Sequence, residues 1–191
     1  MSIHFQNIIT VTNRALCTRP FLEQVERICL LHPKALVLRE KDLSEADYEA
    51  LAKQVLSICE KYDVPCILHS FPDVVIRLQQ DAIHLPLWKL KKMTDDTRHQ
   101  FQTIGCSIHS VKEAMEASSL GATYLTAGHI FTTECKKGLP PRGLSFLKEV
   151  CAATSLPTYG IGGIHLDSSQ MREVMEAGAD GVCIMSEMMR I

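Results

Sequence analysis

The chain has 191 residues, which is enough for one sizeable hydrophobic core and short for two domains. Hydrophobic residues make up 46% and charged residues 22%, values that exclude a disordered or fibrous chain. A formal charge of -2 gives no reason to expect nucleic acid or an anionic membrane as a partner. We therefore expect a single domain over residues 1–191.

The N-terminus and the cysteines bear on the cellular compartment. Residues 1–6 lack a basic segment followed by a long apolar stretch, and no apolar run approaches the roughly 18 residues needed to span a bilayer. The eight cysteines are scattered without C-x-x-C spacing, which indicates reduced thiols. We expect a cytoplasmic protein that does not cross a membrane.

Eight short apolar runs follow one another along the chain, with helix-like segments after them. This alternation predicts β/α units around a parallel sheet. The expected strands are residues 8–12, 35–39, 66–69, 82–85, 103–108, 124–130, 157–161 and 181–186. The clearest helices are expected at residues 44–62, 110–120, 144–154 and 168–177.

The helix boundaries carry their own signals. Ser44 and Ser110 begin capping-box-like segments, in which a hydroxyl and a later carboxylate satisfy free N–H groups. Gly121 and Gly178 come just after helix ends, where a left-handed residue is favoured. No G-x-G-x-x-G follows the first strand, so we prefer a closed (β/α)8 TIM barrel to an open doubly wound α/β sheet. The last helix, after Ser186, has room for only a stub.

Barrels of this kind often bind phosphate at the loops after strands seven and eight. Gly162 and Gly163 close the seventh strand, and glycine lets an anion approach the backbone amides. Met185 and Ser186 close the eighth strand and offer amides at the start of the short helix. The alternative is that the glycines only form a tight turn. We favour a phosphate site.

The segment after the sixth strand, residues 128–138, is expected to form a ligand-binding loop. Thr132 and Thr133 offer hydroxyl donors, and Lys136 or Lys137 offers an ammonium group. His129 is suited to accept and return a proton near neutral pH. The alternatives are a solvated basic loop and a structural histidine.

Two further strand ends should face the same barrel mouth. Arg39 and Lys41 follow the second strand and would add positive charge, whereas Ser107 and His109 end the fifth strand with a hydroxyl and an imidazole. The alternatives are a solvated charge cluster at the second strand and a helix cap, supplied by Ser110, at the fifth.

Histidines near several strand ends raise the possibility of a metal site. They are His69, His84, His109, His129 and His165. No carboxylate or cysteine accompanies them at ligand spacing, so we expect no metal.

Five segments together resemble the thiamine phosphate synthase superfamily of (β/α)8 barrels over nearly the whole chain. They are residues 38–43, 105–110, 131–138, 161–164 and 177–182. The resemblance implies a thiazole phosphate ligand and suggests a homodimer. It also implies that the phosphate lies near Ser107, Thr132 or Thr133, Lys136, Gly163 and Ser186.

Departures from the family pattern bear on the activity. Synthases carry Asn-Asp at the end of strand three and Gln-x-Asp after strand four, which hold Mg²⁺ and a pyrimidine diphosphate. Those positions are His69-Ser70 and Leu87-Trp88-Lys89 in this chain, and Val37 replaces the glutamine expected two residues before the arginine of strand two. Without oxygen ligands a magnesium site is hard to build.

His129 replaces a residue that is usually proline in the synthases, and with residues 135–138 it resembles the thiazole tautomerase branch. We therefore expect an isomerase that aromatises a carboxythiazole phosphate, with His129 moving the proton and with no cofactor. The first alternative is a synthase that couples thiazole phosphate to a pyrimidine diphosphate. The second is a non-catalytic thiazole phosphate sensor or regulatory protein. The roles of His109, Glu40 and Cys135 stay open at this point.

Overall fold

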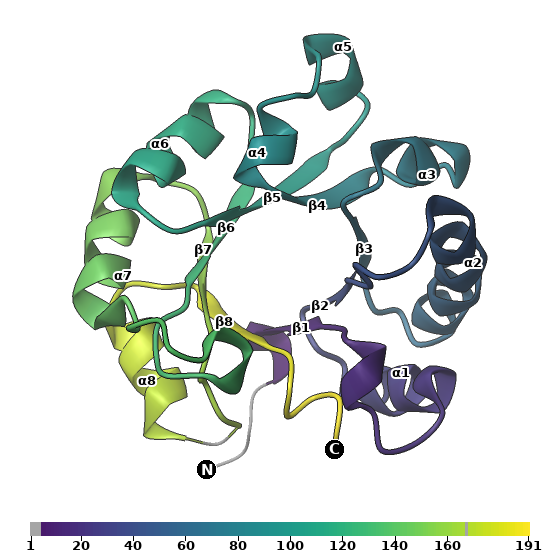
Figure 1. Ribbon diagram of the computed structural model, residues 1–191, viewed down its shortest axis with the longest axis horizontal. Helices are drawn as coiled ribbons and strands as arrows, with labels where there is room; N and C mark the ends of the chain where they lie inside the picture. Colours follow the sequence, from purple (N-terminus) through teal and green to yellow (C-terminus); the bar gives the residue numbers. More distant parts are fainter. Residues whose placement is uncertain (1–4, 167) are drawn as a thin grey trace.

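The computed structural model describes residues 5–166 and 168–191 and contains one closed barrel of eight parallel strands. Figure 1 looks down the barrel, with the strands in a central ring and the helices outside it. The first strand pairs with the last, Ile8 lying opposite Val182, and this pairing closes the ring. The prediction of a (β/α)8 TIM barrel is confirmed.

The observed strands begin within one residue of their predicted starts. They are β1 (Ile8–Val11), β2 (Ala35–Leu38), β3 (Cys66–His69), β4 (Ala82–Pro86), β5 (Thr103–Ile108), β6 (Tyr124–Gly128), β7 (Thr158–Ile161) and β8 (Gly181–Ile184). The sixth and eighth strands end two residues earlier than predicted, because there the chain leaves the ladder for the loops at the mouth.

Helices follow the strands around the outside of the barrel. They are α1 (Phe21–Cys29), α2 (Glu45–Lys61), α3 (Pro72–Arg77), α4 (Leu87–Leu90), α5 (Asp95–Arg98), α6 (Val111–Ser119), α7 (Gly143–Ala153) and α8 (Ser169–Glu176). Short 3-10 turns are η1 (Phe5–Asn7), η2 (Arg14–Leu16) and η3 (Glu134–Lys136). In the part of the chain that the structure describes, none of these helices is long and apolar enough to cross a bilayer.

The predicted helix boundaries are present. The Ser44 hydroxyl accepts a hydrogen bond from the Asp47 amide at 3.2 Å, and Ser110 does the same for the Glu113 amide at 3.1 Å. Gly121 and Gly178 have φ of +85° and +100°, the left-handed conformation that ends α6 and α8.

The expected stub helix after Ser186 is not formed, which corrects the prediction. Residues 186–190 make turns instead, and the segment runs back to α1 (Figure 1). The Gln24 side chain donates to the Met188 carbonyl at 2.7 Å, and Met188 and Met189 are buried. Burial of these two methionines, rather than helix formation, fixes the course of the chain after β8.

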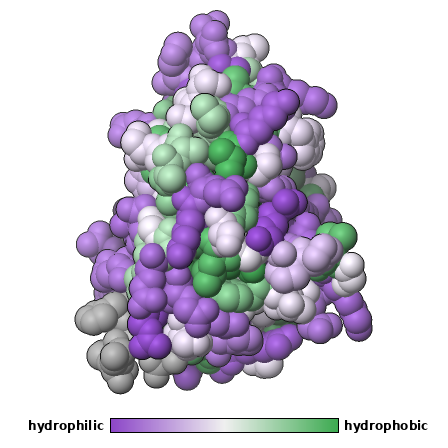
Figure 2. Space-filling view, turned by 90° about the vertical axis from the view of Figure 1, so that its left-hand side faces the viewer, coloured by the Kyte–Doolittle hydropathy of each residue, from purple (hydrophilic) through white to green (hydrophobic). Residues whose placement is uncertain are grey.

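Apolar side chains form two layers. The larger layer lies between the strands and the helices, and the smaller one fills the inside of the barrel, as expected when neighbouring strand residues face opposite sides. Figure 2 shows the side with α7 and α8, where hydrophilic residues cover most of the surface and hydrophobic ones lie in a band between them.

A polar network occupies part of the barrel interior. The ring of His84 hydrogen-bonds at both nitrogens, to the Tyr124 hydroxyl and to the Ser107 hydroxyl, each at 2.8 Å. The His69 ring stacks on His84 with centroids 5.7 Å apart. Burial disfavours the charged forms, so the pKa of His69 is lowered and that of His84 falls from 6.5 to about 3.

This burial predicts that acid destabilises the fold through His84. Between pH 6.5 and about 3 the unfolded chain binds a proton that the folded ring does not, so stability is lost as pH falls through that window. Each such proton contributes about 1.4 kcal/mol per pH unit to the free energy of unfolding. We expect His84→Gln, compared with wild type and with the exposed-site variant His165→Gln, to reduce this slope by about one proton in urea titrations from pH 7 to 4.5. An unchanged slope would contradict the assignment.

Candidate functional site

The ends of β7 and β8 and the loop after β6 meet at one side of the barrel mouth. Gly162 and Gly163 have φ of +100° and +69°. A Cβ on Gly162 would lie 2.4 Å from the His129 Cβ, and one on Gly163 would lie 2.3 Å from the Thr132 carbonyl oxygen. These glycines are therefore required first by the close packing of the β6–α7 loop, which the sequence did not reveal.

The same corner still presents free donors. Within residues 5–166 and 168–191, the backbone N–H groups of Gly163 and Ser186 have no hydrogen-bond acceptor. The Ser186 hydroxyl lies 3.9 Å from the Cys135 sulfur, so the turn of η3 sits against the end of β8 (Figure 1). Met185, just before Ser186, is half-buried. Two amides and a hydroxyl next to this loop are therefore donors that an anion could use.

The predicted loop residues have different environments. Thr133 accepts from the Cys135 amide and so begins η3, while Thr132 and Lys136 are exposed. Lys136 lies close enough to Lys41, after β2, to lower its pKa. The loop therefore reaches across the mouth from β6 toward β2.

Ser107 is held from inside the barrel. Among the described residues, the Tyr124 hydroxyl hydrogen-bonds to His84 Nδ1 and to no other group. Burial raises the pKa of Tyr124, so the hydroxyl keeps its proton and donates it to this nitrogen. The neutral His84 ring then carries its proton on Nε2 and donates to Ser107. Thr126 also donates to Ser107 at 3.2 Å. Both acceptor positions of Ser107 are taken, which leaves its own hydroxyl hydrogen for a ligand.

His129 follows β6 and is half-buried at the mouth, where its Nε2 lies 3.4 Å from the Leu139 carbonyl oxygen. His109 hydrogen-bonds through Nδ1 to the Gly128 carbonyl at 2.7 Å, and Arg142 donates to the same oxygen at 3.1 Å. His109 therefore fixes the end of β6 rather than facing a ligand directly.

A hollow of about 300 Å³ lies at the mouth, at the ends of β2, β3 and β4. It is lined by Glu40, Lys41, His69, Ser70, Phe71, Pro86, Trp88 and Lys89. Arg39, also predicted for the site, is half-buried next to this hollow, and burial lowers its pKa. The structure thus brings Arg39 and Lys41 to the mouth with Lys89, a cation that the sequence analysis did not assign to the site.

Glu40 has a role that the sequence did not disclose. Its buried carboxylate accepts from the Thr12 hydroxyl at 2.7 Å and from the Arg14 amide at 3.1 Å, and it pairs with the Arg14 guanidinium at 3.3 Å. It therefore joins the ends of β1 and β2 and is not free to act as a base. The only sequence signal was an acid placed between two cations.

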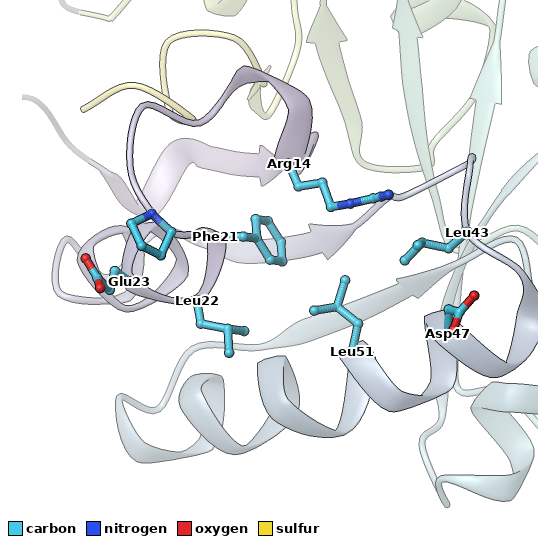
Figure 3. A pocket seen from close by; sticks show the side chains of 8 residues that line it. Arg14, Phe21, Leu22, Glu23, Leu43, Asp47 and Leu51 are labelled. Atoms are coloured by element: carbon cyan, nitrogen blue, oxygen red, sulfur yellow. The ribbon is translucent and has the colours of Figure 1, made fainter.

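A larger hollow, of about 490 Å³, lies outside the barrel between η2, α1 and α2. Figure 3 shows Phe21, Leu22 and Leu51 around it, with Arg14 at its edge. The lining is mostly apolar, and the Arg14 guanidinium is engaged by Asp42 and Glu40. It contains none of the strand-end donors, so we place the functional site at the mouth.

The histidines near the strand ends do not all converge, although the rings of His69 and His84 stack. Both nitrogens of His84 are hydrogen-bonded, His69 Nδ1 lies 2.6 Å from the Ser70 hydroxyl, and His165 is exposed. Among the described residues no group of three or more His, Cys, Asp or Glu side chains could hold a metal ion.

Comparisons with known proteins identify the family. The family described as thiamine monophosphate synthase matches residues 8–188. A thiamine-phosphate synthase of Clostridium novyi is 30% identical over 100% of this chain and 93% of its own length. Thiamine-phosphate synthase 2 of Streptococcus pneumoniae is 33% identical over 94% of this chain and 86% of its own length. The solved thiamine phosphate pyrophosphorylase of Pyrococcus furiosus has a TM-score of 0.81 at 26% identity, covering 97% of this chain and 90% of that one.

These relatives overturn the expected tautomerase. They are named synthases or a pyrophosphorylase and match this chain along nearly its whole length, so the assignment to an isomerase branch on His129 was wrong. For assigning the activity, the similarity of the whole barrel is stronger evidence than one histidine substitution and the missing magnesium ligands. The chain is an enzyme of thiamine biosynthesis and belongs to the thiamine monophosphate synthase family.

Proposed function

We propose that this enzyme couples a thiazole phosphate to a pyrimidine diphosphate, forming thiamine phosphate and releasing diphosphate. The observation that carries the proposal is the full-length similarity to proteins named thiamine-phosphate synthase. Two anion-binding corners on opposite sides of one mouth support it, because the reaction brings together two phosphorylated substrates.

The thiazole phosphate is assigned to the corner at β7 and β8. Its phosphate would accept from the amides of Gly163 and Ser186 and from the Ser107 hydroxyl, whose hydrogen is left free by the interior network. Lys136 on the exposed loop would add a positive charge, and Thr132 a further hydroxyl. His129 would contact the thiazole ring at the end of β6.

The pyrimidine diphosphate is assigned to the 300 Å³ hollow at β2, β3 and β4. Phe71 and Trp88 offer aromatic surfaces for its ring, and Lys41 and Lys89 line the same hollow. In the coupling, the bond between the pyrimidine's carbon and the diphosphate oxygen breaks as a ring atom of the thiazole bonds to that carbon. Negative charge grows on the departing diphosphate, and the nearby cations would stabilise it.

The residues at the ends of β3 and β4 do not fit the magnesium ion that the family resemblance implies. Mg²⁺ prefers carboxylate and other oxygen ligands, whereas these positions carry His69, Ser70 and Lys89. Glu40, the carboxylate in the lining, is already engaged by Thr12 and Arg14. The residues present therefore give the proposed coupling no step at a metal.

A direct assay tests the proposed function. We expect purified protein supplied with thiazole phosphate and pyrimidine diphosphate to form thiamine phosphate, measured by chromatography, in buffers with and without Mg²⁺. Lys136→Ala should raise the KM for thiazole phosphate about tenfold, as loss of a charge-assisted contact predicts, while Lys148→Ala on α7 serves as the control. Absence of product above the enzyme-free rate in both buffers would refute the proposal.

The interior network makes a separate prediction for Tyr124. In Tyr124→Phe the donor to His84 Nδ1 is lost, so the ring is no longer held in the tautomer that donates to Ser107. We expect the affinity for thiazole phosphate, measured by calorimetry, to fall about fivefold, the effect of roughly one hydrogen bond. Tyr159→Phe is the matched control, because its ring packs edge-on against Tyr124 with centroids 6.0 Å apart, whereas the hydrogen bonds of His84 go to Tyr124, Ser107 and Thr126. Equal affinities of Tyr124→Phe and Tyr159→Phe for thiazole phosphate would contradict the hydrogen-bond chain from Tyr124 through His84 to Ser107.

His129 is tested by replacement with asparagine. If the imidazole contacts the thiazole, His129→Asn should raise the KM for thiazole phosphate about tenfold, near the value of one lost polar or packing contact. The KM for pyrimidine diphosphate should stay within twofold. His165→Asn, at an exposed position after β7, should behave as wild type. An unchanged KM in His129→Asn would remove His129 from the site.

A further inference from the structure

Four cations gather at the mouth, and we call them the mouth cation cluster: Arg39, Lys41, Lys89 and Lys136. Burial lowers the pKa of Lys41, and the three other members lower it further through their like charge. Among the described residues, none of the four forms a salt bridge. Like charges held together without salt bridges repel one another, which favours binding of a multiply charged anion.

Lys89 is the member with the most defined position. Its ammonium donates to the Ser70 carbonyl at 2.7 Å and lies 5.2 Å from the centre of the Phe71 ring. The side chain therefore spans from the end of β4 to the end of β3 along one wall of the hollow. An ammonium group has three donors, and the Ser70 carbonyl takes one of them. Two donors are left for a ligand in the hollow.

The position of the Lys89 ammonium also disfavours a metal ion in the hollow. A cation fixed between the ends of β3 and β4 would repel a divalent ion there, and the carboxylate that lines the same hollow, Glu40, already has other partners. Glu40 is held by Thr12 and Arg14 on the β1 side of the hollow.

We propose that the Lys89 ammonium takes the place of a divalent metal ion, so that this mouth binds a diphosphate directly through the mouth cation cluster. The identity of the ligand as a diphosphate rests on the proposed function. A lysine side chain thus supplies the positive charge that a metal ion bound from solution would otherwise supply. Diphosphate binding is thus independent of metal, while the monophosphate corner at β7 and β8 does not depend on Lys89.

Calorimetry with inorganic pyrophosphate tests this inference. We expect wild-type protein to bind pyrophosphate in EDTA, and added Mg²⁺, which complexes pyrophosphate and reduces its charge, should not strengthen the binding. Lys89→Met should weaken binding at least about tenfold, the effect of losing a charge-assisted hydrogen bond. Lys89→Gln, which keeps a donor but loses the charge, should lie between Lys89→Met and wild type.

Lys92→Met is the matched control. The Lys89 ammonium lies 5.5 Å from the centre of the Trp88 ring, and Lys92 lies over the same ring at 5.2 Å but does not line the hollow. This variant should bind pyrophosphate as wild type does, and Lys89→Met should still bind thiazole phosphate normally, which shows that it folds.

The outcomes separate this inference from the proposed function. Pyrophosphate binding that disappears in EDTA, or that is equal in wild type and Lys89→Met, overturns the inference even if thiamine phosphate is made. Metal-independent binding that depends on Lys89, together with no coupling activity, supports the inference and refutes the proposed function.

Discussion

The pairing of β1 with β8 is the constraint on which the site depends. It closes eight parallel strands into a ring, so the carboxyl ends of all strands open at one mouth. Residues distant in sequence are thereby brought together: Cys135 lies beside Ser186, and Lys136 is near enough to Lys41 to lower its pKa. Glu40 secures this geometry at β1 and β2, because its carboxylate follows β2 and accepts from Thr12 and Arg14, which follow β1. An open sheet with the same strands would separate these contacts.

The closed interior adds a second constraint, since polar groups inside it must bond to one another. Tyr124, His84 and Ser107 do so in sequence, and each partner determines which way the next one donates. Gly105 on β5 provides the space: a Cβ there would lie 2.2 Å from the Tyr124 ring and 2.4 Å from His84 Nδ1. Packing of the barrel and orientation of the Ser107 hydroxyl therefore depend on the same residues.

Local features were predictable from the sequence, and features set by register were not. Apolar runs located the strands, and Ser44, Ser110 and the glycines after helices located the boundaries, because each acts within a few residues. The partners of Glu40 lie 26 to 28 residues away and become neighbours only when β1 pairs with β2. The glycines after β7 were assigned to anion approach, although the β6–α7 loop also requires them. The assignment to the tautomerase branch was wrong because it gave single substitutions at the mouth more importance than the similarity of the whole chain to the synthases.

Lys89 illustrates how one substitution can be both a loss and a gain. From the sequence it counted only as a missing magnesium carboxylate, since its contact with Ser70 depends on the packing of β3 against β4. In the folded protein it changes the sign of the charge at that point and adds directional donors. A metal ion carries two charges but must be recruited and held by acids, which would themselves repel a diphosphate. A lysine carries one charge and needs no acid, so in the proposed site Arg39 and Lys41 would act on a diphosphate without opposition from a metal-binding carboxylate.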